Sequence, residues 1–252
     1  MRNQHIDYKI IKILKTSNGN NEISIIQIKD KKYILKKADS SDMAVVNMLK
    51  NETNILYKLR NFDIAPKLYH YCFNEQNNSI IIELIKGKPI NKLNLETTKI
   101  KIALMLKITD SVKKLHKHNI VHCDLKPSNI LLDLNKNIKI IDYGISVDNH
   151  KNYFAGYGSV KYCSKNQLLN KEIDENVDLY SLGIIFYELI FGKSPFTGTK
   201  EEIIKKKKLN LYDKTNNQYL NLIFSKLFDD AIYKYKTIEE FEKDLKLLLA
   251  YS

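Results

Sequence analysis

Residues 177–191 form a stretch that is apolar on nearly every side. A helix on the surface of a protein carries one apolar stripe, whereas a helix that is apolar all round is buried. We therefore expect residues 177–191 to form a helix in the middle of a domain. The chain of 252 residues is long enough to surround it, since a domain of that size buries roughly three quarters of the surface of its unfolded chain.

The first third of the chain has the pattern of short antiparallel strands. Runs rich in β-branched residues are separated by polar turns at residues 16–21 and 29–32. The predicted strands comprise residues 10–14, 23–28, 33–37, 67–73 and 79–84. The Lys-Gly-Lys-Pro segment at residues 86–89 follows the last strand and is interpreted as a linker. It is the candidate boundary between two parts of the chain.

One helix is predicted within the strand-rich part. Its apolar stripe consists of Val45, Met48, Leu49, Glu52 and Leu56. One carboxylate therefore lies on an otherwise apolar face. This position favours a buried pairing for Glu52, while a surface pairing with Lys50 or Lys58 stays open as the alternative.

After the linker the pattern is helical. One amphipathic helix has its stripe at Leu104, Ile108, Val112 and Leu115. Thr237 and Glu240 have the spacing of a capping box, which opens a last helix with the buried face Ile238, Phe241, Leu245 and Leu248. Strands followed by helices predict an α+β fold with a small β-rich lobe and a larger helical lobe.

The composition excludes several classes of protein. With 44% hydrophobic and 28% charged residues, the chain is neither disordered, collagen-like nor a disulfide scaffold. It has no apolar run long enough to span a membrane, and its beginning lacks the pattern of a secretion signal. Cys72, Cys123 and Cys163 are too few and too scattered for a zinc site or a bridge framework. We expect a reduced, cytoplasmic protein without a membrane partner.

The charge is strongly positive, with 41 basic and 29 acidic residues and a formal net charge of +12. Such an excess favours acidic partners or nucleic acid through long-range fields. The lysines are spread along the chain, however, and the only dense run is at residues 205–208. We interpret that run as a solvated helix face, and we do not expect a nucleic-acid partner.

Two polar residues lie beside apolar, strand-like runs. Asn129 precedes Ile-Leu-Leu, and Asp142 follows Ile-Lys-Ile-Ile. Oxygen-bearing side chains at strand ends, with a lysine nearby, suit a hard cation such as Mg²⁺ that carries phosphates. These positions are the candidate metal ligands.

The segment His-Cys-Asp-Leu-Lys-Pro-Ser-Asn at residues 122–129, together with Asp-Tyr-Gly at residues 142–144, resembles the eukaryotic-type Ser/Thr protein kinases. The resemblance extends over about residues 8–248. It implies a bilobal fold with an antiparallel β-rich N-lobe at 1–85, a mainly helical C-lobe at 86–252 and a hinge at about 83–88. It also implies ATP and Mg²⁺ as cofactors and a protein substrate with a Ser or Thr acceptor.

The same resemblance implies a role for each matched residue. Asp124 would accept the proton of the substrate hydroxyl, and Lys126 would steady the γ-phosphate. Lys36, in Tyr-Ile-Leu-Lys, would hold the α- and β-phosphates and pair with Glu52, unless a one-residue slip puts Lys37 there. Asn129 and Asp142 would bind the metal. The remaining nucleotide-binding positions would be Ile23, Ile34, Glu83, Ile85, Asn129, Leu131 and Asp142.

Further matches lie in the second half of the chain. Residues 158–162 resemble the substrate-docking loop, and Asp178 resembles the aspartate that holds the catalytic-loop backbone. Ser-Lys-Asn at residues 164–166 stands where Ala-Pro-Glu is expected, and Lys234 falls near the usual arginine partner of that glutamate. Cys123 replaces an arginine that grips a phosphorylated loop, which predicts activity independent of loop phosphorylation.

The chain departs from the family at its glycine-rich loop, where Thr16, Asn18 and Asn21 occupy the glycine positions. Side chains there hinder the approach of backbone to phosphates, and Ile34 in place of alanine narrows the adenine slot. We therefore weigh three functions: an active Ser/Thr protein kinase, a pseudokinase that acts as a binding or regulatory module, and a small-molecule kinase. Regulation by a protein partner, by expression level or by neither stays open.

Overall fold

The computed structural model describes residues 6–17, 21–148, 158–171, 173–229 and 234–251. The chain divides into two compact units, which are described separately below. The first contains residues 1–87 and 139–144, and the second contains residues 88–138 and 145–252. The predicted α+β fold class, with an antiparallel sheet first and a mainly helical part after it, is confirmed. The predicted lobe boundary between residues 85 and 86 stays a prediction.

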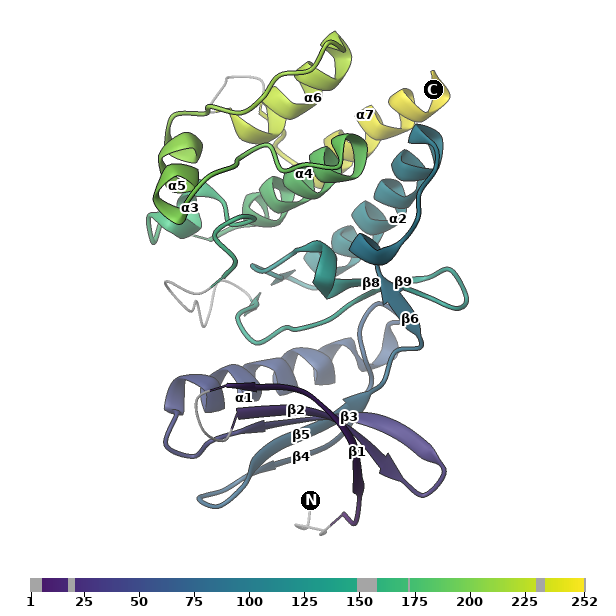
Figure 1. The fold of residues 1–252 in the computed structure, drawn as a ribbon, viewed down its shortest axis with the longest axis vertical. Helices are drawn as coiled ribbons and strands as arrows, with labels where there is room; N and C mark the ends of the chain where they lie inside the picture. Colours follow the sequence, from purple (N-terminus) through teal and green to yellow (C-terminus); the bar gives the residue numbers. More distant parts are fainter. Residues whose placement is uncertain (1–5, 18–20, 149–157, 172, 230–233, 252) are drawn as a thin grey trace. The chain divides into compact units, whose positions relative to one another are not determined.

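The first unit contains a five-stranded antiparallel sheet (Figure 1). Its strands are β1 (Lys9–Ser17), β2 (Asn21–Ile28), β3 (Lys31–Ala38), β4 (Leu68–Phe73) and β5 (Asn78–Glu83), in the order β1-β2-β3-β5-β4. All five predicted strands are present, with ends that differ by a few residues. Residues 16 and 17, predicted to lie in a turn, instead extend β1, because Thr16 and Ser17 pair with Glu22 and Asn21.

The register of the sheet separates two faces of β3. Ile34 is paired with Ile82 and Lys36 with Ile80, so these side chains share one face of the sheet. Leu35 lies on the other face, where it packs with Ile26 and Ile81 in a buried cluster. Alternation along β3 therefore decides that Lys36, and not Lys37, shares the face of Ile34.

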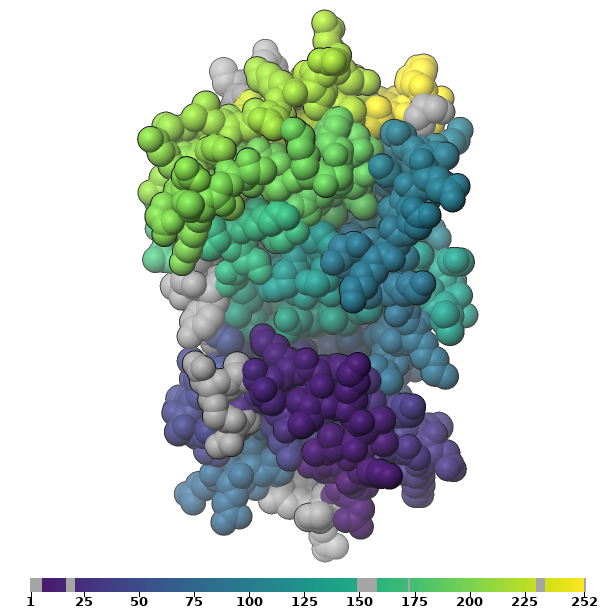
Figure 2. All heavy atoms as spheres, in the orientation of Figure 1, coloured from purple at the N-terminus to yellow at the C-terminus, as the bar shows by residue number. Residues whose placement is uncertain are grey.

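Helix α1 (Met43–Lys58) packs against β3, β4 and β5 and is followed by the short helix η1 (Leu59–Asn61). The side chain of Asp42 caps its beginning by accepting a hydrogen bond from the N–H of Val45. The predicted stripe is buried at Leu49, Glu52 and Leu56. Strand β1 forms the edge of the sheet away from the strands that α1 covers. Figure 2 shows it on the surface, and its residues Ile11, Ile13 and Leu14 are exposed.

The second unit is built around α4 (Asn176–Phe191), in which every residue from Val177 to Tyr187 is buried. The prediction of a central helix is confirmed. Helix α2 (Thr98–Lys117) packs against α4 and α7 (Ile238–Ala250), and α6 (Gln218–Phe228) packs against α4. At Gly183 a Cβ atom would lie only 2.9 Å from the ring of Phe228, so glycine permits the close approach of α4 and α6. Two shorter helices are α3 (Lys165–Leu168) and α5 (Lys200–Lys208).

Short strands and 3₁₀ turns complete the fold. Strand β7 (Ile120–Val121) pairs with β10 (Val147–Asp148), and a second small sheet has the order β6-β8-β9. Its strands are β6 (Gly87–Pro89), β8 (Ile130–Asp133) and β9 (Ile138–Ile140), while η2 (Ile90–Lys92) and η3 (Pro127–Asn129) are 3₁₀ turns. Residues 87–89 of the segment interpreted as a linker form β6, and the division between the two units falls inside that segment, after Gly87.

The predicted capping box at the beginning of α7 does not form. Thr237 makes no side-chain hydrogen bond to the helix. The carboxylate of Glu240 accepts from the N–H of Lys236 at 2.8 Å, one residue before the N-cap that a capping box requires. The buried face of α7 is nevertheless as predicted at Ile238, Phe241 and Leu245. Among the described residues, no helix combines the length and apolarity needed to cross a membrane.

Candidate functional site

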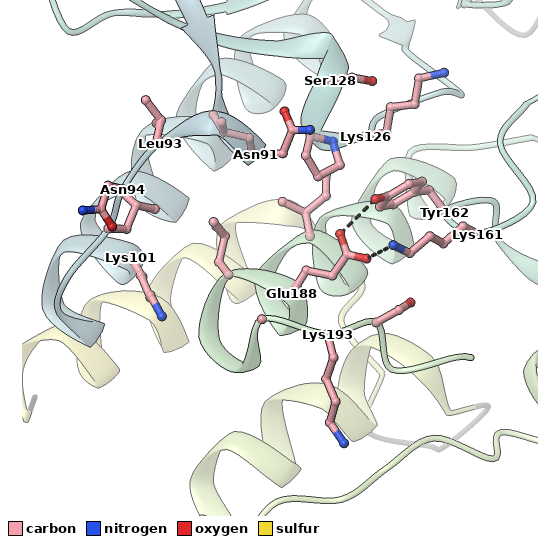
Figure 3. Close-up of a pocket in the computed structure, with 17 residues that line it drawn as sticks. Asn91, Leu93, Asn94, Lys101, Lys126, Ser128, Lys161, Tyr162, Glu188 and Lys193 are labelled. Carbon is pink, nitrogen blue, oxygen red and sulfur yellow. Dashed lines mark hydrogen bonds and ion pairs between the residues drawn. The ribbon is translucent and has the colours of Figure 1, made fainter. Parts of the chain in front are cut away.

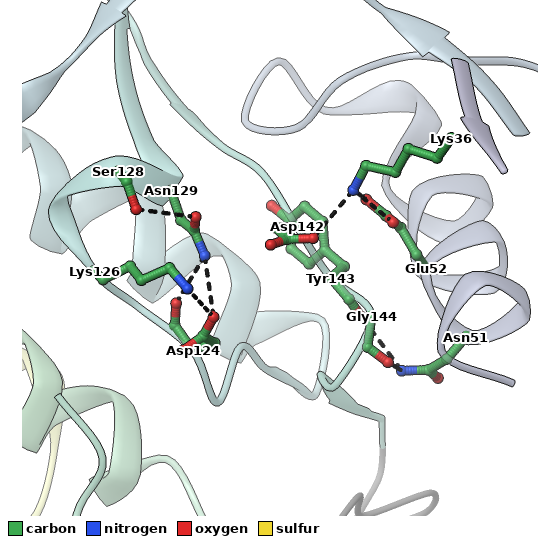
Figure 4. Close-up of polar contacts among 10 residues, drawn as sticks. All are labelled: Lys36, Asn51, Glu52, Asp124, Lys126, Ser128, Asn129, Asp142, Tyr143 and Gly144. Atoms are coloured by element: carbon green, nitrogen blue, oxygen red, sulfur yellow. Dashed lines mark hydrogen bonds and ion pairs between the residues drawn. The ribbon is translucent and has the colours of Figure 1, made fainter. Parts of the chain in front are cut away.

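A lysine and two carboxylates meet in the first unit. The Lys36 Nζ lies 2.7 and 2.8 Å from the two carboxylate oxygens of Glu52 and 3.1 Å from Asp142 Oδ1 (Figure 4). Strand β3 supplies the lysine, α1 supplies Glu52, and the segment after β9 supplies Asp142. Glu52 is 2% exposed, so its alternative pairing with Lys50 or Lys58 at the surface is wrong.

Burial and charge compete in this cluster. Burial alone lowers the pKa of Lys36, but the charges of Asp142 and Glu52 and the hydrogen bonds to them outweigh it and raise the pKa above the ordinary value. Burial raises the pKa of Glu52, and Lys36 counteracts part of that rise. Lys36 therefore remains an ammonium at neutral pH. A buried ammonium beside a half-exposed carboxylate, that of Asp142, is suited to bind an anion together with a cation.

Helix α1 also holds the backbone that carries Asp142. The amide nitrogen of Asn51 donates to the carbonyl oxygens of Tyr143 (3.3 Å) and Gly144 (3.1 Å). Asp142 has a φ of 73°, a left-handed conformation that is uncommon outside glycine. The ring of Tyr143 is fully buried. These contacts place the Asp142 carboxylate through the backbone of the two residues that follow it.

The other nucleotide positions predicted in the first unit lie on β2, on β3, at the end of β5 and two residues after it. Ile23 pairs with Lys36 across the two strands and Ile34 pairs with Ile82, so all four side chains share one face. Glu83 donates its N–H to the carbonyl of Lys67 at 2.9 Å. Ile85 follows it and is half-buried. Leu131 lies on β8, which belongs to the second unit.

Two of the three residues at the expected glycine positions lie in described parts of the chain. Thr16 is part of β1. The side chain of Asn21 accepts from the N–H of Asp39 at 2.8 Å and donates to the carboxylate of Asp42 at 3.2 Å. Asn21 therefore ties the beginning of β2 to the segment before α1. Asn18 lies outside the described residues, so the predicted turn at this point does as well.

A second polar cluster surrounds Asp124 in the second unit. The Lys126 Nζ donates to Asp124 Oδ2 at 2.6 Å, and the amide nitrogen of Asn129 donates to the Asp124 carbonyl at 3.1 Å (Figure 4). The N–H of Ser159 donates to Asp124 Oδ1 at 3.0 Å, and the Ser159 hydroxyl accepts from Lys126 at 3.0 Å. The catalytic-loop residues predicted from the sequence are therefore joined to the predicted docking loop by direct hydrogen bonds.

The backbone before Asp124 is held by a buried carboxylate. Asp178, in the first turn of α4, is fully buried and accepts from the N–H groups of His122 (2.8 Å) and Cys123 (3.0 Å). His116 Nε2 lies 3.0 Å from the same carboxylate. His122 serves as an acceptor for the N–H of Asp124 at 3.2 Å, which agrees with a structural role. Asp178 thus occupies the place predicted for it.

Cys123 does not behave as a reactive thiol. Its side chain is 2% exposed, and burial followed by the charge of Asp178 raises its thiol pKa well above the ordinary value. A protonated, buried thiol is a weak nucleophile. Of the hydroxyls considered as modification sites, Tyr153 and Tyr157 lie outside the described residues, and Ser159 takes part in the contacts with Asp124 and Lys126.

Lys207 is the residue that sequence reasoning missed. The lysine run at residues 205–208 was interpreted as a solvated face, which is wrong for Lys207, whose side chain is 0% exposed. Its Nζ donates to the carbonyl oxygens of Val160 (2.9 Å), Lys161 (2.9 Å) and Cys163 (2.7 Å). Lys234, which falls near the position of the arginine that pairs with the family's Ala-Pro-Glu glutamate, is exposed. The docking loop is therefore held by the side-chain nitrogen of Lys207, which comes from α5.

The environment of Lys207 predicts a pH-dependent stability. Burial lowers its pKa from 10.5 to about 7. At pH values between these two pKa values, Lys207 is protonated in the unfolded chain and deprotonated in the folded chain. The free energy of unfolding therefore rises with pH in this window, by up to about 1.4 kcal/mol per pH unit. Urea unfolding across this window should show the wild type gaining stability relative to Lys207→Met. A difference that stays constant with pH would contradict the prediction, and Lys208→Met, at an exposed position of α5, is the control.

The two predicted metal positions both carry side-chain oxygen donors. Within the described parts of the chain, no group of three or more His, Cys, Asp or Glu side chains could hold a metal ion. Asp142 offers a carboxylate in the first unit, and Asn129 offers an amide oxygen in the second. Magnesium is usually bound by one or two protein oxygens together with substrate phosphates and water. Each of these two oxygen donors, taken by itself, is of the kind that binds a cation arriving with a nucleotide.

Comparison with known proteins gives a consistent result. Residues 16–250 match the family described as protein kinase domain. A probable serine/threonine-protein kinase of Clostridium perfringens is 27% identical over 229 residues, which are 84% of this chain and 33% of that protein. An Aurora kinase of Dictyostelium discoideum is 30% identical over 64% of this chain and 43% of its own length. The serine/threonine-protein kinase PrkC of Bacillus subtilis is 32% identical over 57% of this chain and 24% of its own length.

Proposed function

Because the chain belongs to the protein kinase family, we propose that it transfers the γ-phosphate of ATP to Ser or Thr hydroxyls of protein substrates, with Mg²⁺ as the metal. The observation that carries this proposal is the buried ammonium of Lys36, 2.7 Å from Glu52 and 3.1 Å from Asp142. The matched relatives named as serine/threonine-protein kinases support the choice of acceptor. The chain spans less than half the length of these relatives.

In the first unit, Lys36 binds the α- and β-phosphates. Glu52 holds the ammonium in place, since both of its oxygens accept from Nζ. Asp142 serves as a metal ligand, and its 49% exposed side chain is open to a cation that arrives with the nucleotide. Positioning and charge stabilisation are the main contributions that a protein makes to phosphoryl transfer. Both are available from these three side chains.

In the second unit, Asp124 orients the acceptor hydroxyl and accepts its proton. Its carboxylate is 12% exposed and is held by the ammonium of Lys126 and by the N–H of Ser159. Lys126 steadies the transferred phosphate as a positive charge, and Asn129 is the second metal ligand. Mg²⁺, when bound, would supply positive charge against the negative charge that the phosphate develops during transfer. These roles rest on the family match together with the geometry around each side chain.

Two further features bear on the proposal. The three cysteines are free thiols, which supports a reducing compartment, and we place the protein in the cytoplasm.

The absence of glycine at positions 16, 18 and 21 favours a second candidate function, that of a pseudokinase that acts through binding. The two candidates differ in whether MgATP is bound and its phosphate transferred.

The test is incorporation of labelled phosphate from ATP into a generic protein acceptor or into the chain itself. Wild type should label the acceptor only with Mg²⁺ present, and Asp142→Asn, which removes one ligand charge while keeping the size of the side chain, should lose most of that labelling. MgATP at 100-fold its Kd should also raise the free energy of unfolding by about 2.7 kcal/mol. Equal silence of wild type and variant would reject the enzyme, and no stabilisation by MgATP would favour the pseudokinase.

A further inference from the structure

A cavity of about 560 Å³ opens in the second unit beside the candidate catalytic loop (Figure 3). Three of its wall residues, Lys126, Pro127 and Ser128, directly follow the segment of Asp124. Lys161 and Tyr162 of the docking loop also line it, together with residues from the last turns of α4, from the three residues after α4 and from the segment around η2. Cavities of this volume accommodate ligands or side chains of a bound chain. A segment seated here would lie next to the proposed transfer site.

The only carboxylate among the residues that line this cavity is that of Glu188, and it is already neutralised. The Lys161 Nζ lies 2.6 Å from Glu188 Oε1, and the Tyr162 hydroxyl donates to Oε2 at 2.9 Å (Figure 3). Burial and the charge of Glu188 raise the pKa of Tyr162, so its hydroxyl stays a donor. Both oxygens of Glu188 are therefore engaged. A cationic side chain entering the cavity would have to displace Lys161.

The remaining charges on the walls are positive. Lysines line the cavity at positions 101, 126, 161 and 193. Even when Asp124 and Asp213, the partners of Lys126 and Lys193, are counted with Glu188, four ammonium groups face three carboxylates. Lys101 donates to the carbonyl of Ile190 at 3.4 Å, a bond that leaves its charge uncompensated. Walls of one sign focus the field and attract ligands of the opposite sign.

One buried hydroxyl in the wall also points to a ligand. Ser194 is 8% exposed, it lines the cavity, and its Oγ has no hydrogen-bond partner among the described residues. A buried hydroxyl without a partner is uncommon in folded proteins, because the lost hydrogen bond to water is not replaced. A ligand with acceptor oxygens would satisfy it. Asn91 and Asn94 supply further amide donors in the wall opposite (Figure 3).

We propose that this cavity binds an acidic side chain of the protein substrate, so that the chain selects acceptor hydroxyls flanked by Asp or Glu. The substrate carboxylate pairs with the ammonium of Lys101, while Glu188 remains the counter-ion of Lys161 and Asp213 that of Lys193. This inference rests on the proposed function, because it takes the bound segment to be the substrate of the transfer reaction. The net charge of +12 on the whole chain acts in the same direction by steering acidic partners toward it.

Binding of short peptides tests the inference without requiring phosphate transfer. Fluorescently labelled peptides with one serine and flanking Asp, Lys or Ala residues are titrated with the full chain, and the Kd values are obtained from anisotropy. The Asp peptide should bind about tenfold more tightly than the Lys peptide, and the preference should weaken as salt is raised. Tighter binding of the Lys peptide, or binding of neither, would overturn the inference.

Three variants locate the effect in the cavity. Lys101→Glu should remove most of the preference for the Asp peptide, whereas Lys99→Glu, on the same helix but outside the cavity, should leave it largely unchanged. Glu188→Gln should tighten binding of the Asp peptide, because Lys161 loses its counter-ion. Equal effects of Lys99→Glu and Lys101→Glu, weaker Asp-peptide binding by Glu188→Gln, or equal competition by an RNA oligonucleotide would each overturn the proposal. The labelling assay above decides the proposed function independently of these outcomes.

Discussion

Replacing Asp178 by alanine is expected to lower the free energy of unfolding by about 3–5 kcal/mol, the largest stability effect that we predict for this chain. The carboxylate is fully buried and accepts from the N–H groups of His122 and Cys123. Without it, two buried donors are left without partners, and each costs about 1–3 kcal/mol. His116 also loses its contact at 3.0 Å.

Urea unfolding of wild type and Asp178→Ala at neutral pH measures this loss. Asp110→Ala is the matched control, since Asp110 lies on the exposed surface of α2, where it pairs with Lys114 at 2.7 Å. Exposed ion pairs contribute about 0–1 kcal/mol, so the control should stay close to wild type. Similar losses for the two variants would show that Asp178 does not hold the loop backbone. Asp178 holds the backbone of His122 and Cys123, the two residues that precede Asp124. Because the Asp178 variant loses this support for the position of Asp124, it should also lose activity.

Replacing Asp124 by asparagine should reduce kcat by about 10²–10⁴-fold, the range that a positioned general base contributes. Asparagine keeps an oxygen to accept from the Ser159 N–H, which lies 3.0 Å from Asp124 Oδ1. It cannot accept the proton of the substrate hydroxyl. The variant should therefore fold as wild type does and lose the transfer step.

The measurement is the rate of phosphate transfer to a protein acceptor, together with stabilisation by MgATP. Asp124→Asn should keep that stabilisation, because the proposed phosphate-binding Lys36 and Glu52, which holds it, belong to the other unit. Asp110→Asn serves as the control for replacing an aspartate elsewhere in the second unit. Undiminished turnover by Asp124→Asn would remove Asp124 from its proposed role, while loss of MgATP binding would indicate a wider structural change.

Much of the fold could be predicted from local patterns. The five strands follow from β-branched runs, and the buried position of Glu52 follows from its place on an apolar stripe. Alternation along β3 correctly distinguished Lys36 from Lys37, because successive side chains of a strand point to opposite faces. The burial of the whole central helix followed from the same kind of reasoning. These properties depend only on residues that lie close together in the sequence, within one or two helical turns or within a single strand.

Other features could not be predicted, because they depend on segments distant in sequence. Lys207 stands in a run of four lysines, and nothing in that run distinguishes it from its neighbours. Its three carbonyl partners lie 44 to 47 residues away in the chain. Thr237 and Glu240 illustrate a local pattern that did not form the expected structure. Their spacing fits a capping box, but the carboxylate of Glu240 accepts a hydrogen bond from the N–H of Lys236 instead.

Residue order alone was enough to predict the five strands of the first sheet, helices α1, α2, α4 and α7, and the family motifs, because periodicity and spacing are local properties of the chain. Packing in three dimensions was needed to establish which lysine is buried, which carboxylate of the cavity is neutralised and which hydroxyl lacks a partner. The physical reason is that burial and charge compensation are set by the groups that surround a side chain. In a folded domain, those groups come from segments tens of residues apart.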